Sequence, residues 1–194
     1  MLPTMSATEI ADKIADNDRL SEEEHVSLRV RMKQVTSKRD FLRPVENPNA
    51  APNSKKRYPR LELARAAILT DAILVGFESA ALITVAEALE RPPVVDISHA
   101  PSASIDGAFF YPNGLESAVR GINANDPGRW FLTFSCGRNH ETRKPVWAAF
   151  VTYQKETDER SDAGLYTNPF RHPIIRGEFD LTERLTPFAW MLKE

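Results

Sequence analysis

Eleven lysine and arginine residues lie between Arg29 and Arg65, and only three acidic residues accompany them. The 28 residues before this segment hold two basic and seven acidic residues, and the 129 residues after it hold 12 and 17. Clustered lysine and arginine side chains neutralise phosphate groups, which is the chemistry that nucleic-acid binding needs. The net charge of −2 therefore conceals a segment of charge +8 between two segments of −5. A solvated basic face paired with the acidic flanks is the alternative interpretation.

The residue types of metal and catalytic sites are sparse. Cys136 is the only cysteine, and His140 follows it at a spacing that supplies two zinc ligands where three or four are needed; His99 and His172 lie elsewhere. No nucleophile motif surrounds Cys136, and the glycines form no phosphate-binding loop. We therefore expect no metal site, no catalytic residue and no cofactor, and we do not expect an enzyme. The alternative to a zinc ligand is a strand-end cysteine that faces the core.

The basic segment begins within a helix that the sequence predicts over residues 21–40. Ser21 and Glu24 have the spacing of a capping box. A shorter helix over residues 6–16, with Thr8 as its cap, precedes this one. Cations cover much of the second helix, which repels itself unless an anionic partner lies against it. The apolar stripe of this helix comprises Val26, Leu28 or Val30, Met32 and Val35.

A polar loop over residues 46–54 holds two prolines, three asparagines and one serine. It separates two short extended pieces, residues 42–45 and 55–58, and it predicts a hairpin-like connection between them. Helices over residues 60–75 and 80–89 follow, with apolar residues at helical spacing. This half of the chain therefore has the order helix, helix, short strand, loop, short strand, helix, helix.

Pro92 and Pro93 close this unit, so we place one domain at residues 1–92 and a second at residues 93–194. The second domain has a β-rich character. Trp130–Cys136 and Val146–Tyr153 are strand-like and predict an antiparallel hairpin. A helix over residues 115–122 and a terminal helix after Asp180 complete it. Its aromatic side chains either fill the core or line an effector pocket. The whole chain is predicted to be α+β.

The order of elements in the first domain is that of a winged helix-turn-helix, and three landmarks carry a more specific resemblance. Residues 31–45 (RMKQVTSKRDFLRPV) resemble the end of the recognition helix and the start of the wing in MerR-type transcriptional regulators. Residues 57–63 (RYPRLEL) resemble the end of that family's wing, and residues 76–79 (GFES) resemble its turn into the next helix. The resemblance covers about residues 7–90.

The chain departs from that family at two places. The junction before the second helix, residues 17–21, is longer than the tight turn usual there. Pro92 and Pro93 interrupt the chain where MerR-type regulators continue into a long dimerisation helix. The family's inducers, metal sensing and dimer interface therefore do not carry over.

The resemblance implies a sequence-specific transcriptional regulator of bacterial or phage origin that binds double-stranded DNA as a homodimer. We expect it to be cytoplasmic and nucleoid-associated, because no membrane span and no signal peptide is evident. The second domain would dimerise, sense a small molecule or contact another protein. Two alternatives remain: a protein-interaction factor, such as an anti-repressor or co-regulator, and an excisionase-like DNA-architectural protein.

In this interpretation the helix over residues 21–40 enters the major groove, and the wing over residues 43–58 lies on the backbone. Arg29, Arg31 and Lys33 would lie nearest the bases. Tyr58 either directs its hydroxyl group at a phosphate or fills the core. The predicted DNA-contacting residues are Arg29, Arg31, Lys33, Lys38, Arg39, Arg43, Lys55, Lys56, Arg57 and Tyr58.

Overall fold

The chain forms two compact units, Met1–Glu78 together with Glu194, and Ser79–Lys193. Both units contain helices and strands, which confirms the predicted α+β class. No helix among the described residues is long and apolar enough to cross a membrane. The computed structural model describes residues 4–37, 41–45, 55–95, 113–125, 128–139, 141–154 and 175–192.

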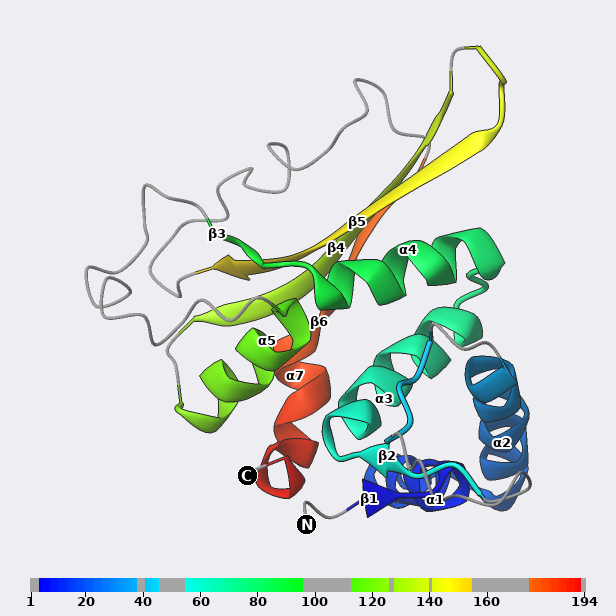
Figure 1. Ribbon diagram of the computed structural model, residues 1–194, viewed down its shortest axis with the longest axis vertical. Coiled ribbons are helices and arrows are strands. Elements are labelled where there is room, and N and C mark those ends of the chain that lie inside the picture. Colours follow the sequence, from blue (N-terminus) through cyan, green and yellow to red (C-terminus); the bar gives the residue numbers. More distant parts are fainter. Residues whose placement is uncertain are drawn as a thin grey trace. The chain divides into compact units, whose positions relative to one another are not determined.

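The first unit packs three helices around an apolar core, with two short strands at its edge (Figure 1). Its core side chains come from all three helices and include Ile10, Ile14, Leu28, Met32, Val35, Leu63, Ile68 and Leu69. In chain order its elements are β1 (Thr4–Met5), α1 (Ala7–Asp18), α2 (Glu22–Ser37), β2 (Tyr58–Pro59) and α3 (Leu61–Leu74).

The N-cap of helix α1 lies two residues before the predicted one. Ser6, not Thr8, is the N-cap, and its extended backbone lets Ser6 Oγ accept the N–H of Glu9 at 3.2 Å. Glu9 Oε2 accepts the N–H of Ser6 in return at 2.6 Å, which completes a capping box. At the other end of the unit, α3 ends before Gly76, whose positive φ of 94° suits glycine.

The short strand β2 pairs with β1 and not with residues 42–45 as predicted. Thr4 lies opposite Pro59 and Met5 lies opposite Tyr58 in an antiparallel register. Residues 42–45 still lie beside the segment before β2, because the N–H of Val45 donates to the carbonyl of Arg57 at 2.7 Å. Pro44 has no N–H to donate, so this segment is a poor partner for a ladder of hydrogen bonds.

The second unit is a four-stranded sheet with the strand order β3-β5-β4-β6. The predicted hairpin is confirmed, since β4 pairs with β5 antiparallel along the full length of both strands. Strand β3 pairs with β5 in parallel, and β6 pairs with β4 antiparallel. The elements are α4 (Ser79–Glu90), β3 (Val94–Val95), α5 (Gly114–Asn123), β4 (Arg129–Arg138), β5 (Pro145–Gln154), β6 (Ile175–Asp180), α7 (Leu181–Leu185) and the 3-10 helix η3 (Thr186–Met191).

Helices cover one face of this sheet. A Cβ atom added to Gly121 would meet the Trp130 ring, and one added to Gly114 would meet the side chain of Val151, so α5 packs closely there. Trp130 is buried, and its ring centroid lies 4.9 Å from that of Tyr153 across the hairpin. Trp130 therefore lies in the core of the unit, whereas the other described aromatic side chains of the hairpin, Tyr153 among them, are partly exposed.

Helix α4 belongs to the second unit, so the boundary falls at residues 78–79 and not near residue 92 as predicted. The buried face of α4 carries Leu82, Val85 and Leu89, and the helix contacts β5, β4 and α5. Two prolines after a helix mark where the helix ends, but they do not show which core the helix packs against.

Candidate nucleic-acid interface

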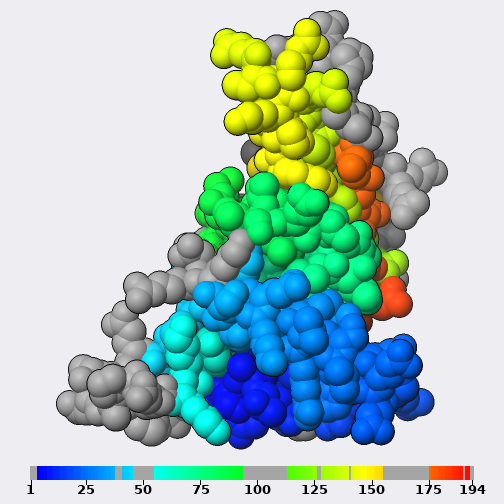
Figure 2. Space-filling view, turned by 90° about the vertical axis from the view of Figure 1, so that its right-hand side faces the viewer, coloured from blue at the N-terminus to red at the C-terminus, as the bar shows by residue number. Residues whose placement is uncertain are grey.

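Helix α2 is fixed at its first turn and along one face. Ser21 and Glu24 form the predicted capping box: the N–H of Ser21 donates to Glu24 Oε2 at 2.8 Å, and the N–H of Glu24 donates to Ser21 Oγ at 3.4 Å. Hydrogen bonds from Ser21 also hold the pKa of Glu24 below its ordinary value. Leu28, Met32 and Val35 are buried on one face of the helix. The exposed residues of α2 form part of the blue surface in Figure 2.

Val26 and Val30 lie outside the buried face of α2. Their side chains are 57% and 52% exposed, whereas Leu28 is buried. The prediction that Val26 belongs to the apolar stripe is therefore wrong, and of the two alternatives Leu28 and Val30, Leu28 is the core residue. Positions two apart on a helix differ by about 200° in direction, so the three side chains cannot share one face.

The two arginines of α2 are held by neighbours. Arg29 Nη2 lies 3.1 Å from Asp12 Oδ1 on helix α1, and His25 Nε2 lies 3.0 Å from the same oxygen. Arg31 Nη1 donates to Ser27 Oγ at 2.9 Å, one turn earlier on α2. The sequence places these arginines near the bases, but it gives no sign of the carboxylate across the helix pair.

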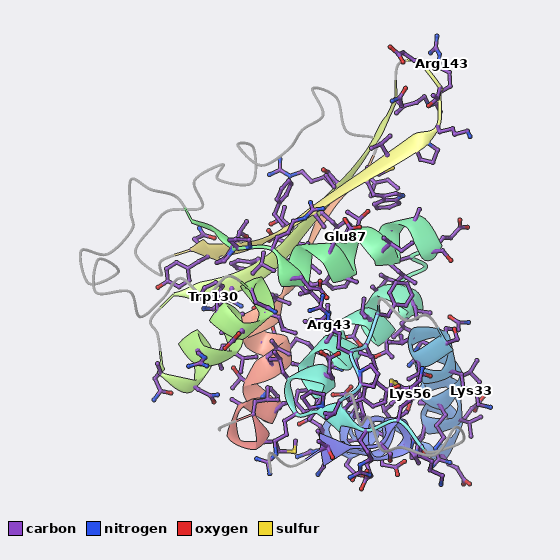
Figure 3. The ribbon with its side chains drawn as sticks, in the orientation of Figure 1. Lys33, Arg43, Lys56, Glu87, Trp130 and Arg143 are labelled. Carbon is purple, nitrogen blue, oxygen red and sulfur yellow. The ribbon has the colours of Figure 1, made fainter. Side chains whose placement is uncertain are left out.

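Three exposed lysines in this unit have no ion pair among the described residues: Lys33 on α2, and Lys55 and Lys56 before β2. Figure 3 labels Lys33 and Lys56. These ammonium groups are available to phosphate oxygens. Lys38 and Arg39, which were predicted to contact DNA, lie outside the described residues, as does the loop over residues 46–54.

Arg57 ties the segment before β2 to the start of the chain. Its Nη1 lies 2.8 Å from Glu9 Oε2, its Nε donates to Thr4 Oγ1 at 3.3 Å, and its Nη2 donates to the Thr4 carbonyl. Hydrogen bonds from Ser6, and then the charge of Arg57, lower the pKa of the Glu9 carboxyl. Arg57 therefore already has a structural role within the unit.

A buried carboxylate fixes the chain where the expected wing begins. The exposed residue Arg43 donates its backbone N–H to Glu62 Oε2 at 3.1 Å. Glu62 Oε1 lies 3.4 Å from Arg65 Nε, and both side chains are almost fully buried. Arg65, one of the eleven cations of the basic segment, therefore adds no charge to the surface.

Tyr58 lies in the core, where 2% of the residue is exposed. Burial, and then the charge of Glu62, raise the pKa of its hydroxyl group above the ordinary value of 10.0. Of the two roles that the sequence left open, the structure shows the core role, so the Tyr58 hydroxyl group is not exposed to a phosphate.

A second cationic group lies at the tip of the β4–β5 hairpin, outside the predicted set. Arg138, Arg143 and Lys144 are exposed and have no ion pair with a described residue (Figure 3 labels Arg143). The amide oxygen of Asn139 accepts two backbone N–H groups of the turn, at 2.9 and 2.8 Å, which fixes the turn. Replacement of these three cations therefore removes the same charge as replacement of Lys33, Lys55 and Lys56, at a different place in the chain.

Cys136 is buried, and burial raises the pKa of its thiol above the ordinary value. A thiol in this state is a poor nucleophile and a poor metal ligand. Among the described residues no group of three or more histidine, cysteine, aspartate or glutamate side chains could hold a metal ion. His99, His140 and His172 lie outside the described residues.

The sequence matches no family model, and comparisons with curated proteins and with solved structures find no match. The function proposed below therefore depends on the residues of this chain and their arrangement.

Proposed function

We propose that this chain is a sequence-specific DNA-binding transcriptional regulator of bacterial or phage origin, whose first unit is a MerR-like winged helix-turn-helix. The observation that carries the proposal is the set of exposed lysines Lys33, Lys55 and Lys56, on α2 and on the segment before β2, which have no ion pair with a described residue. Two successive helices, a polar connection, a short strand and a third helix are the parts from which such a domain is built.

In this proposal α2 lies in the major groove, which is wide enough to admit a helix. Lys33 contacts the DNA from α2, and Lys55 and Lys56 hold phosphate oxygens beside the groove. Arg29 and Arg57 lie against Asp12 and Glu9, and these carboxylates reduce the positive charge that the two arginines add to the surface. The hydrogen bond from Arg43 to Glu62 holds the backbone at the start of the wing in one position.

One such unit makes few base contacts, so we propose that the protein binds an inverted repeat as a homodimer. The second unit then serves dimerisation, a small-molecule effector or another protein. Light scattering coupled to size-exclusion chromatography, with and without a duplex, measures the oligomeric state. A complex of one protein chain per duplex would contradict the homodimer.

Electrophoretic mobility shift with duplex fragments of the source genome tests the proposal. We expect a fragment retained at low salt by the full chain and lost by the variant K33Q/K55Q/K56Q. The variant R138Q/R143Q/K144Q removes the same charge from the hairpin tip and serves as the matched control, so it should keep the shift. No retained fragment at low salt would refute the proposal.

The exposed pair Val26 and Val30 favours a second candidate, a factor that grips another protein with α2. Such a factor would bind no duplex at low salt, and a protein partner recovered by pull-down would be lost from the variant V26S/V30S. The mobility-shift experiment therefore separates the two candidates.

A further inference from the structure

Two valines stand among the exposed polar residues of α2, where a DNA-reading helix commonly carries arginine. Val26 and Val30 are more than half exposed, on the side of the helix away from Leu28 and Met32. They lie four residues apart, so their side chains sit above one another on the same face. Neither helix propensity nor core packing explains two exposed β-branched residues at these positions.

The exposed Glu22 and Glu23 lie one turn before Val26, and the cations of the helix lie beside or after the pair. The side chain of Arg29 is directed to helix α1, where it meets Asp12, and Arg31 is bound back to Ser27 on its own helix. Lys33 follows Val30 by three positions and is exposed. An arginine that reads guanine must present its guanidinium group to the O6 and N7 atoms of the base. Both arginines of α2 are engaged elsewhere, so the face between them is left to the valines.

The major groove offers one apolar group to such a face, the C5-methyl group of thymine. Lys33, one turn after Val30, is exposed and can contact a phosphate beside the groove. We propose that Val26 and Val30 contact thymine methyl groups and that this contact sets the base preference of the protein. The inference rests on the proposed function. Four residues of helix rise by about 6 Å, so the two contacted thymines would lie about two base pairs apart along the groove.

The test uses the full chain and duplexes selected from a random pool at low salt. The thymines of the selected site are replaced by deoxyuridine, which keeps every hydrogen-bonding group and lacks only the methyl group. We expect the affinity to fall about fourfold for each contacted thymine, the effect of exposing one buried methyl group. Equal affinity for the thymine and deoxyuridine duplexes would overturn the inference while leaving the proposed function standing.

Variants assign the effect to the two side chains. V26S and V30S remove both γ-methyl groups of the valine, so each should lose the preference for thymine over deoxyuridine at one position. V75S changes another exposed valine, 60% exposed at the end of α3, and should keep the full preference. A preference for thymine retained by V26S/V30S would overturn the inference. If no duplex is selected by the wild-type chain, the proposed function fails as well.

Discussion

Replacement of Glu62 by glutamine removes one charge from a buried ion pair and little else. Glu62 Oε1 lies 3.4 Å from Arg65 Nε, and the two side chains are 4% and 1% exposed. Glu62 Oε2 accepts the N–H of Arg43, and a glutamine carbonyl oxygen can accept the same bond. E62Q therefore keeps the hydrogen bond to Arg43 and removes the carboxylate charge that lies 3.4 Å from the buried Arg65 Nε.

The free energy of unfolding should fall by about 3–5 kcal/mol in E62Q, the usual cost of removing one partner of a buried ion pair. For a unit of this size that loss lowers the midpoint of thermal unfolding by more than about 10 °C. Urea unfolding followed by far-ultraviolet circular dichroism measures the free energy. The signal at 222 nm comes mainly from helices, so its change reports the loss of helical content on unfolding.

A double variant, E62Q/R65M, tests the reason for the loss. Methionine removes the buried charge and fills similar space, so most of the lost stability should return, because apolar replacements of buried pairs are often neutral. A loss below about 1 kcal/mol in E62Q, or a double variant no more stable than E62Q, would refute the reasoning.

Three further predictions concern single groups. Burial raises the pKa of the Tyr58 hydroxyl group in the folded chain, so Tyr58 ionises first in the unfolded chain. The free energy of unfolding should therefore keep its full value below pH 10 and fall as the pH rises through the pKa of the folded state. Y58F should lessen this loss in alkaline unfolding curves. S21A removes one side of the capping box with Glu24 and should cost about 1 kcal/mol in urea unfolding. G121A should destabilise the second unit by about 1–3 kcal/mol in the same assay, because the added Cβ would lie 2.6 Å from Trp130 Nε1. Glycine-to-alanine replacement in a helix usually stabilises, so a more stable G121A would contradict this packing.

Local signals in the sequence predicted the helices and the hairpin well. The capping box at Ser21 and the alternation over residues 130–136 each depend on neighbouring residues, and the structure confirms both. Gly76 also ends α3 as predicted. Such features are readable because capping and alternation act within a few residues of the chain.

Pairings between distant residues were not readable. Strand β1 has two residues, too few to show a period, so its pairing with β2 gave no signal. The sequence also did not show which unit α4 belongs to, because its apolar face is compatible with the core of either unit. The alternative of a basic face paired with the acidic flanks holds for Arg29 and Arg57, but the sequence did not indicate that Asp12 and Glu9 would be their partners.

The candidate interface is therefore narrower than the basic segment suggested. Its charge of +8 includes a buried arginine, Arg65, and two arginines with carboxylate partners, Arg29 and Arg57. Three exposed lysines of this segment have no ion pair with a described residue: Lys33, Lys55 and Lys56. Sequence reasoning found these lysines from charge alone, but it assigned Val26 to the core, because an alternating pattern of valine and arginine on α2 fits more than one choice of buried face.

The central claim is that the lysines of the first unit neutralise phosphates, and the salt dependence of duplex binding measures this most directly. Each phosphate contact contributes about 0.9 to the slope of log affinity against log salt concentration. Fluorescence anisotropy with a labelled duplex should give a steep slope for the full chain and a slope shallower by about 2–3 for K33Q/K55Q/K56Q. The slope of R138Q/R143Q/K144Q should equal that of the full chain. A flat slope for the full chain, or equal losses in the two variants, would contradict the account.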